Sequence, residues 1–279
     1  MNILYQDDAI LLIDKPAGLP VLPDGWDADA PYLLKLLEEQ LSIVGHESTR
    51  TGTRTLTGTR TLTGTRTLTG TRPDPVGRWS PDQRSQRPSR LWVVHRLDKI
   101  TSGVMVFART ADAHRALNLQ FEHHEAQKVY HAICFGAPAW DEHTARRKLR
   151  VNVGHSHRTV VDNGQGKPAE TAFKVLKRYK GFGLLESIPA TGRTHQIRVH
   201  AYALGHPLVG DILYNALRQA QDNAPQTDLI ARPALHAFSL TITHPVTGER
   251  LTFGAPYPDD FAKALARLVA EHPDRDISS

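Results

Sequence analysis

Short apolar segments with the alternation expected of strands are spread along most of the chain. They occupy residues 9–13, 104–108, 129–135, 184–188, 235–242 and 251–253. Runs of this length and composition are typical of β-strands. Their spacing is irregular, without the regular strand–helix alternation of a parallel doubly wound sheet. The pattern therefore predicts an α+β fold with a mixed, mostly antiparallel central sheet flanked by helices and loops.

Helical periodicity marks four further segments. They cover residues 31–41, 111–123, 194 to about 204, and 259–271. Thr110 is a typical N-cap residue for the second of them, and Gly205 is a stop signal for the third. A period of about 3.6 residues places His195, Arg198 and Tyr202 on one face of the third helix, opposite its apolar residues. Arg198 can then face a site while the helix packs against the core.

Residues 49–72 form a near-perfect repeat of the hexapeptide TRTLTG and lead into a segment rich in Pro, Ser and Arg. Each repeat contains one leucine, which is too little apolar surface for a solenoid. We therefore expect residues 46–90 to be a flexible insertion. This insertion interrupts a single domain that is formed by residues 1–45 and 91–279.

The overall composition is that of a soluble globular chain of 279 residues. No segment approaches the roughly 20 apolar residues of a membrane span. The first residues have no basic segment ahead of an apolar core, which argues against a signal peptide. A single cysteine excludes an internal disulfide and a zinc site built only from thiolates. We therefore expect a cytoplasmic protein with no membrane partner.

The net charge of +5 and the isoelectric point near 9.4 are typical of a nucleic-acid-binding protein. Five arginines within residues 49–72 account for the whole excess. A local cluster is more informative, because residues 143–161 include no carboxylate. This stretch contains the basic residues Arg146, Arg147, Lys148, Arg150 and Arg158. It indicates either a solvated face or a surface that follows a phosphate backbone.

The sequence HRLDKITSG at residues 95–103 is an unusually dense polar group ahead of an apolar strand. Thr, Ser and Gly favour a tight turn that would hold Asp98 on a fixed loop with its carboxylate pointing outward. A carboxylate in that position suits a nucleophile or a general base. The alternative is that Asp98 caps the turn and pairs with Arg96. Spacing alone leaves both interpretations open.

Several segments, taken in order, resemble motifs of the RluA-type pseudouridine synthases. They are HRLDKITSG at 95–103, KVY at 128–130, GKPAET at 166–171, TGRTHQIRVH at 191–200, GHP at 205–207, GD at 210–211, LHA at 235–237 and HP at 244–245. Together they form a specific match that covers nearly all of the chain outside the insertion, and the resemblance implies the pseudouridine synthase fold. Many members carry a small RNA-binding domain ahead of the catalytic domain. This sequence opens directly at a strand and the turn DKPAG, so we expect a catalytic domain alone, with that turn as structural support near the site.

The resemblance implies that the chain isomerises uridine to pseudouridine in structured RNA, either 23S rRNA, tRNA or both. The N1–C1′ bond breaks, the uracil turns, and C5 bonds to C1′, so no cofactor is expected. In the family the residue matching Asp98 is catalytic. By the same match, Arg198 is the guanidinium that keeps Asp98 ionised. The match also implies that Tyr130 stacks on the target base and assists proton removal at C5. We expect the protein to act on RNA as a monomer.

The family resemblance also implies a set of RNA contacts. The target uridine must leave its stack to reach Asp98, and Arg96 is expected to fill the gap. Arg193 and His195 are expected to contact the RNA nearby. The phosphate backbone is expected to lie against Arg146, Arg147, Lys148 and Arg150.

Three other functions are alternatives to this one. A metal hydrolase would draw on the fifteen histidines, but helical periodicity puts His195 and His200 on different faces, and we expect no bound metal. A glycosidase would need a second carboxylate beside Asp98, and none is evident. A noncatalytic RNA-binding module would keep the basic residues but tolerate the loss of Asp98.

Overall fold

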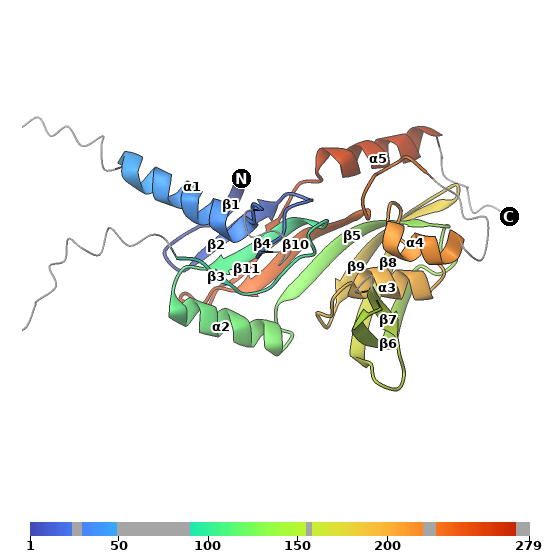
Figure 1. Cartoon of the computed structure of the whole chain (residues 1–279), viewed down its shortest axis with the longest axis horizontal. Helices are drawn as coiled ribbons and strands as arrows, with labels where there is room; N and C mark the ends of the chain where they lie inside the picture. The colour runs from blue at the N-terminus through green and yellow to red at the C-terminus, as the bar shows by residue number, and fades with distance from the viewer. Residues whose placement is uncertain (24–29, 49–89, 155–157, 220–226, 272–279) are drawn as a thin grey trace, which may run out of the picture.

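The computed structural model describes residues 1–23, 30–48, 90–154, 158–219 and 227–271 (Figure 1). The predicted insertion at residues 46–90 lies almost entirely outside this part of the chain. Its flexibility, and the division of the chain that depends on it, therefore stay predictions.

The described residues form one mixed sheet of eleven strands in the order β1-β2-β4-β10-β5-β9-β8-β6-β7, with β11 paired to β10 and β3 paired to β4. The strands are β1 (Asn2–Gln6), β2 (Ile10–Lys15), β3 (Trp92–Val93), β4 (Ser102–Ala108), β5 (Gln127–Phe135), β6 (Glu142–Val153), β7 (Arg158–Val161), β8 (Lys167–Tyr179), β9 (Phe182–Pro189), β10 (Leu235–Thr243) and β11 (Arg250–Gly254). The pair β4–β10 is parallel, and the other strand pairs are antiparallel. The predicted α+β fold with a mostly antiparallel sheet is confirmed.

Five helices of the described residues pack on this sheet (Figure 1). They are α1 (Leu33–Ser48), α2 (Ala111–Glu122), α3 (Gln196–Ala203), α4 (Ile212–Gln219) and α5 (Asp259–Glu271). Among the described residues, none of the helices has the length and apolar character needed to span a membrane.

Helices α1 and α2 lie on opposite sides of β2 and β4 (Figure 1). Leu37 of α1 shares an apolar cluster with Ile13, whereas Leu117 of α2 shares another with Leu12. Side chains of neighbouring strand residues point to opposite faces, which explains why Leu12 and Ile13 contact different helices. The N-terminus of α2 is capped by Thr110, as predicted.

Strand β5 separates two further clusters in the same way. Its residues Ala132 and Cys134 pack with α3, while Ile133 and Phe135 pack with α5. This is the alternation that the sequence of β5 predicts. Strand β10 lies between β4 and β5, and it therefore joins the part of the sheet covered by α1 and α2 to the part covered by α3 and α5.

One local prediction was wrong, and two strands were not predicted. The third helix begins at Gln196 rather than at residue 194, because His195 adopts a left-handed backbone conformation with φ of 54°. The basic run at 143–161 was not predicted to be a strand, yet most of it belongs to β6 and β7. Strand β6 buries little more than Ala145 and Leu149, so its apolar signal is weak.

Candidate active site

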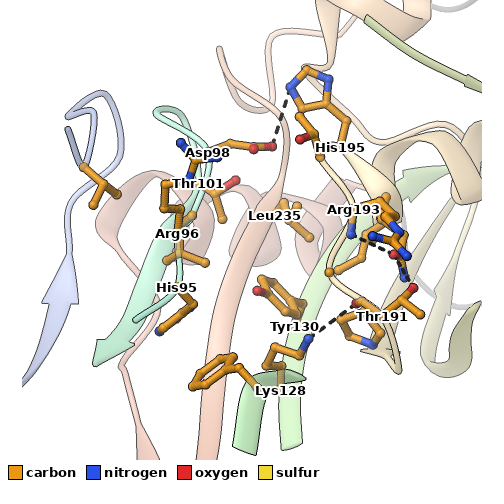
Figure 2. Close-up of a pocket in the computed structure, with 18 of the residues that line it drawn as sticks. His95, Arg96, Asp98, Thr101, Lys128, Tyr130, Thr191, Arg193, His195 and Leu235 are labelled. Carbon is orange, nitrogen blue, oxygen red and sulfur yellow. Dashed lines mark hydrogen bonds and ion pairs between the residues drawn. The ribbon is translucent and has the colours of Figure 1, made fainter. Parts of the chain in front are cut away.

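A cleft of about 810 Å³ lies where three chain segments meet: the loop between β3 and β4, the start of β5, and the segment that leads into α3 (Figure 2). Its walls include the predicted site residues Arg96, Asp98, Tyr130, Arg193, His195 and Arg198. Residues separated by about a hundred positions in the sequence therefore meet in one site. Arg146, Arg147, Lys148 and Arg150 do not line this cleft.

Asp98 lies on a loop whose backbone is held by hydrogen bonds from a buried lysine, Lys15. The backbone N–H of Thr101 donates to the carbonyl of Asp98 at 3.0 Å, which closes the turn. Lys15, which is fully buried, donates from Nζ to the carbonyls of Pro16, Lys99 and Thr101 at 2.8–3.0 Å. Burial, partly opposed by the Asp98 carboxylate, lowers the pKa of Lys15 to about 8. Lys15 therefore fixes the loop and does not itself line the cleft.

The two ends of the Asp98 loop are also fixed. His95 accepts a hydrogen bond at Nε2 from the backbone N–H of Val106 and stacks on Phe121 at 4.6 Å. At the other end Gly103 has φ of +115°, and a Cβ atom there would lie 2.2 Å from the carbonyl oxygen of Ala237. Only glycine fits at this position, where β4 runs beside its parallel neighbour β10. The loop therefore presents the carboxylate in one position.

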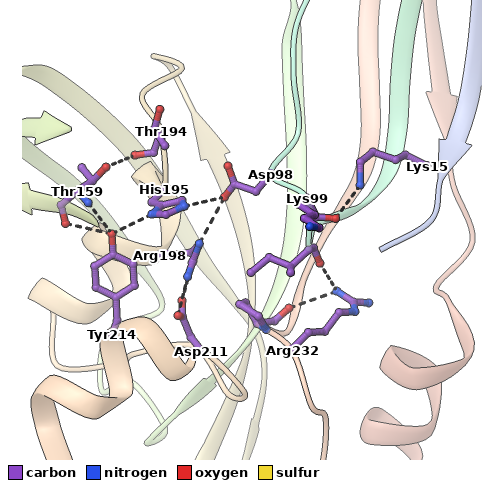
Figure 3. Close-up of polar contacts among 12 residues, drawn as sticks. Lys15, Asp98, Lys99, Thr159, Thr194, His195, Arg198, Asp211, Tyr214 and Arg232 are labelled. Atoms are coloured by element: carbon purple, nitrogen blue, oxygen red, sulfur yellow. Dashed lines mark hydrogen bonds and ion pairs between the residues drawn. The ribbon is translucent and has the colours of Figure 1, made fainter. Parts of the chain in front are cut away.

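The carboxylate of Asp98 faces two cationic or basic side chains. Its Oδ2 lies 3.6 Å from Nη1 of Arg198 and 3.8 Å from Nε2 of His195 (Figure 3). The side chain of Asp98 is 27% exposed, so it is open to the cleft. Within the described residues, Asp98 does not form the alternative ion pair with Arg96.

Arg198 is almost completely buried and makes its strongest contacts with Asp211. Its Nε and Nη2 atoms donate to the two carboxylate oxygens of Asp211 at 2.6 and 2.7 Å (Figure 3). Burial disfavours the charged guanidinium, but the hydrogen bonds to Asp211 outweigh it, and the pKa of Arg198 is raised. Arg198 thus stays charged and points its remaining nitrogen at Asp98.

The two faces predicted for α3 are present in the structure. Ile197, Ala201 and Leu204 pack in one apolar cluster. His195, Arg198 and Tyr202 lie on the other side, where all three contact Tyr214. All six residues from Gln196 to Ala201 are buried. His195 lies ahead of the helix, and its ring is placed by the left-handed turn. Arg198 reaches the site because Asp211 and the ring of Tyr214, 5.2 Å from its guanidinium carbon, hold it there.

Gln196 anchors the segment that carries Arg193 and His195. Its Oε1 accepts hydrogen bonds from the backbone of Arg193 and the hydroxyl of Thr191, at 3.1 and 2.6 Å. Its Nε2 donates to the carbonyl of Glu170 and the hydroxyl of Thr171, at 2.8 and 2.9 Å. The buried amide is thereby fully satisfied, and it fastens one wall of the cleft to β8.

Tyr130 lies on β5 with its ring in the cleft (Figure 2). It packs at the junction of the two apolar clusters around α1 and α3. Burial, reinforced by the nearby Asp98 carboxylate, raises the pKa of the Tyr130 phenol. The ring is therefore a rigid, neutral surface beside Asp98.

The basic residues fall into two groups. Arg96 and Arg193 are exposed at the cleft, where they can meet a polyanion. On β6, Arg146 instead pairs with Glu170 at 2.9 Å, and Arg150 pairs with Asp162 at 2.7 Å. Residues 143–161 contain no carboxylate, but Asp162 and Glu170, which follow them in the sequence, pair with two of their arginines. Of the four β6 residues expected to contact phosphate, Arg147 and Lys148 are exposed and have no such ion pair within the described chain.

Two residues of the site were not assigned roles by sequence reasoning. Asp211 appears only within the short GD match, and Tyr214 has no motif of its own. Gly210 provides a signal in hindsight, because its φ of +72° and the close carbonyls of Ile230 and Arg232 leave no room for a side chain. That turn delivers Asp211 to Arg198.

A metal centre has no support among the described residues, where no three His, Cys, Asp or Glu side chains are grouped to hold an ion. His200 is buried and bonds through Nδ1 to the hydroxyl of Thr171 at 2.9 Å. His155 and His157 lie outside the described residues.

A family model described as RNA pseudouridylate synthase matches residues 9–203, which include every cleft residue discussed above. The chain belongs to this family. Its members are isomerases, and the predicted fold and enzyme class are confirmed.

Three curated relatives each carry the name ribosomal large subunit pseudouridine synthase D. The relative from Zymomonas mobilis is 31% identical over 96% of this chain and 73% of its own length. The relative from Nitrosomonas europaea is 33% identical over 100% of this chain and 68% of its own length. The relative from Neisseria meningitidis is 34% identical over 97% of this chain and 62% of its own length. The chain thus spans about two thirds of the length of these relatives.

Solved structures support the same fold. Human RNA Pseudouridylate Synthase Domain Containing 4 superposes with a TM-score of 0.63 at 23% identity, over 96% of this chain and 92% of its own. Human RNA Pseudouridylate Synthase Domain Containing 1 superposes with a TM-score of 0.59 at 24% identity, over 92% of this chain and 83% of its own.

Proposed function

We propose that this chain converts uridine to pseudouridine in structured RNA and that Asp98 is the catalytic residue. The observation that carries the proposal is the position of the Asp98 carboxylate, open to the cleft and 3.6 Å from the buried, charged Arg198. A carboxylate held at this position, beside a fixed guanidinium and open to the cleft, can act as a nucleophile or a base.

The reaction rearranges one nucleoside and consumes nothing else. The N1–C1′ bond breaks, the uracil turns within the cleft, and C5 bonds to C1′. C5 then loses a proton, and N1 carries one in the product. Asp98 serves either by attack on the sugar or base or by removal of a sugar proton.

The cleft suits an extruded nucleoside. Its volume of about 810 Å³ falls within the usual range of small-molecule sites, about 300–1,000 Å³. A uridine within a stem must flip out to reach Asp98, at a cost of a few kcal/mol. In this proposal Tyr130 stacks on the flipped base, Arg96 occupies the position that the base has left, and Arg193 contacts a nearby phosphate.

We propose large-subunit ribosomal RNA, the 23S rRNA, as the substrate, acted on in the cytoplasm. The names of the three curated relatives favour this RNA. A tRNA arm is the other structured RNA that the sequence predicts, and it is included in the test below.

The test compares the wild-type chain with Asp98→Asn on 23S rRNA transcripts and on total tRNA, with pseudouridine mapped at nucleotide resolution. Asp112→Asn is the matched control, because Asp112 is exposed on α2, away from the cleft. We expect modification by the wild type and the control, and none by Asp98→Asn, with RNA affinity preserved. Equal modification by Asp98→Asn would refute the catalytic role. Modification of tRNA alone would replace the proposed substrate.

A further inference from the structure

His195 occupies a position that simple RNA contact does not explain. Its backbone is left-handed, with φ of 54°, a conformation that costs energy for a residue other than glycine. The ring is held edge-on to Tyr214, with Nδ1 3.2 Å from the Tyr214 hydroxyl and Nε2 3.8 Å from Oδ2 of Asp98 (Figure 3). The backbone strain therefore places the ring between a buried phenol and the catalytic carboxylate.

The Tyr214 hydroxyl determines which nitrogen of His195 carries the proton. This hydroxyl accepts from the backbone N–H of Thr159 at 3.1 Å and donates its single proton to the carbonyl of Thr159 at 3.0 Å. With that proton already used, the contact to Nδ1 requires that Nδ1–H donate to the hydroxyl. Burial raises the pKa of Tyr214 to about 12, so the phenol keeps its proton. Neutral His195 is therefore protonated at Nδ1.

We infer that His195 is a proton acceptor in the isomerisation, with the bare Nε2 facing the cleft beside Asp98. This inference rests on the proposed function and assigns one further catalytic residue to it. No hydrogen-bond donor to Nε2 is found among the described residues, and the Asp98 carboxylate, 3.8 Å from Nε2, accepts and does not donate. A substrate proton fits between these two acceptors.

The proton that His195 takes is the one released at C5. After C5 has bonded to C1′, the C5–H electrons return to the uracil ring and the proton moves to Nε2. The imidazolium so formed is stabilised by Asp98, and its proton then passes to solvent or to N1. No oxidant, reductant or further reagent is required, because the product carries one proton more at N1 and one fewer at C5.

The surroundings keep His195 neutral and ready at neutral pH. Burial lowers its pKa, the Arg198 guanidinium lowers it further, and the carboxylates of Asp98 and Asp211 oppose both. Tyr214, whose hydroxyl contacts Nδ1, stays protonated. A neutral imidazole that gains a partner anion once protonated has the properties of a general base.

Nitrogen-15 NMR of the histidine-labelled protein tests the geometry without substrate. We expect His195 at neutral pH to be a neutral ring with a protonated Nδ1 and an unprotonated Nε2, identified by loss of its signals in His195→Gln. In Tyr214→Phe, both tautomers should be populated. A ring protonated at Nε2 in the wild type would overturn the inference.

Kinetics with RNA deuterated at uridine C5 test the role itself. In His195→Gln, which keeps a polar side chain but no base, we expect kcat to fall about 100-fold with KM unchanged. A primary isotope effect should appear or grow, because proton removal becomes slow. His143→Gln, an exposed histidine on β6, is the control.

The outcomes separate the inference from the proposed function. A rise in KM without a change in kcat or isotope effect would assign His195 to RNA contact and overturn the inference. Wild-type activity in His195→Gln would do the same while leaving the proposed function intact. A wild-type protein that modifies no RNA would refute the proposed function, and with it the substrate step.

Discussion

Arg198 and Asp211 form a buried, two-point ion pair with distances of 2.6 and 2.7 Å, and this pair leaves one guanidinium nitrogen directed at Asp98. Both side chains are at most 3% exposed. The position of the guanidinium next to Asp98 is thus set by a residue that does not line the cleft.

Replacement of Asp211 by Asn should destabilise the protein and slow the reaction. Loss of one partner leaves the buried Arg198 charge uncompensated, at a cost of about 3–5 kcal/mol in unfolding free energy. We also expect a lower kcat, because Arg198 is then free to move relative to Asp98. Urea unfolding and single-turnover modification of RNA measure the two effects.

A second two-point pair provides the control for Asp211→Asn. Asp260 bonds Arg232 through both oxygens, but its side chain is 45% exposed. Asp260→Asn should therefore cost less than about 1 kcal/mol and leave kcat unchanged. Equal losses in the two variants would show that burial of the Arg198 pair has no special importance.

Gly103→Ala should displace the Asp98 loop. The added methyl would collide with the backbone of Ala237. Gly181 also has a positive φ, of +82°, but a methyl added there meets nothing within 4 Å. We expect Gly103→Ala to lose about 1–3 kcal/mol more stability than Gly181→Ala. It should lose activity as well, while Gly181→Ala keeps its kcat. Thermal unfolding measures the stability of both variants, and RNA modification assays measure their kcat. A Gly103→Ala variant with full activity would argue against a rigid loop.

The stability of the loop should depend on pH through His95. Burial, with a smaller effect of Lys128, lowers the pKa of His95 to about 3 from its usual 6.5. Between these values the unfolded chain binds a proton that the folded chain does not, so stability falls as pH falls from 6.5 towards 3.

His95→Gln keeps an acceptor for the Val106 N–H but does not titrate. We therefore expect the wild type to lose more unfolding free energy than His95→Gln when the pH is lowered from 7 to 4. Urea titrations at both pH values give the difference. Equal losses of unfolding free energy in the two proteins would show that His95 is exposed to solvent and titrates normally in the folded chain.

The basic residues should differ in their contribution to RNA binding. Arg193 is exposed at the cleft, and Arg193→Ala should reduce the slope of log K against log salt by about 0.7–0.9. The predicted phosphate contacts of Arg147 and Lys148 should give a similar change for each alanine variant. Arg146→Ala should change the slope less, because Glu170 already neutralises Arg146. Filter binding at several salt concentrations measures these slopes.

The sequence predicted the apolar strands and the position of the site, for reasons visible in particular residues. Strands such as β4 are buried on both faces and read as continuous apolar runs. Strand β6 has two buried residues, Ala145 and Leu149, four positions apart among exposed residues, so its sequence lacks the alternation that marks a strand. The left-handed backbone at His195 could not be predicted, because the residue is not a glycine, the usual sequence signal for that conformation. Likewise the partnership of Arg198 with Asp211 joins residues thirteen positions apart across a turn, and only the tertiary fold brings them together.

Strand β10 is contributed by residues 235–243, yet it separates β4 from β5 in the sheet. The Asp98 loop leads into β4 and Tyr130 lies on β5, so the sheet aligns the two residues through this late segment, which pairs with both strands. During synthesis, a ribosome must release most of the chain before any uridine can be modified. Catalytic competence therefore reports that β4, β10 and β5 have been assembled.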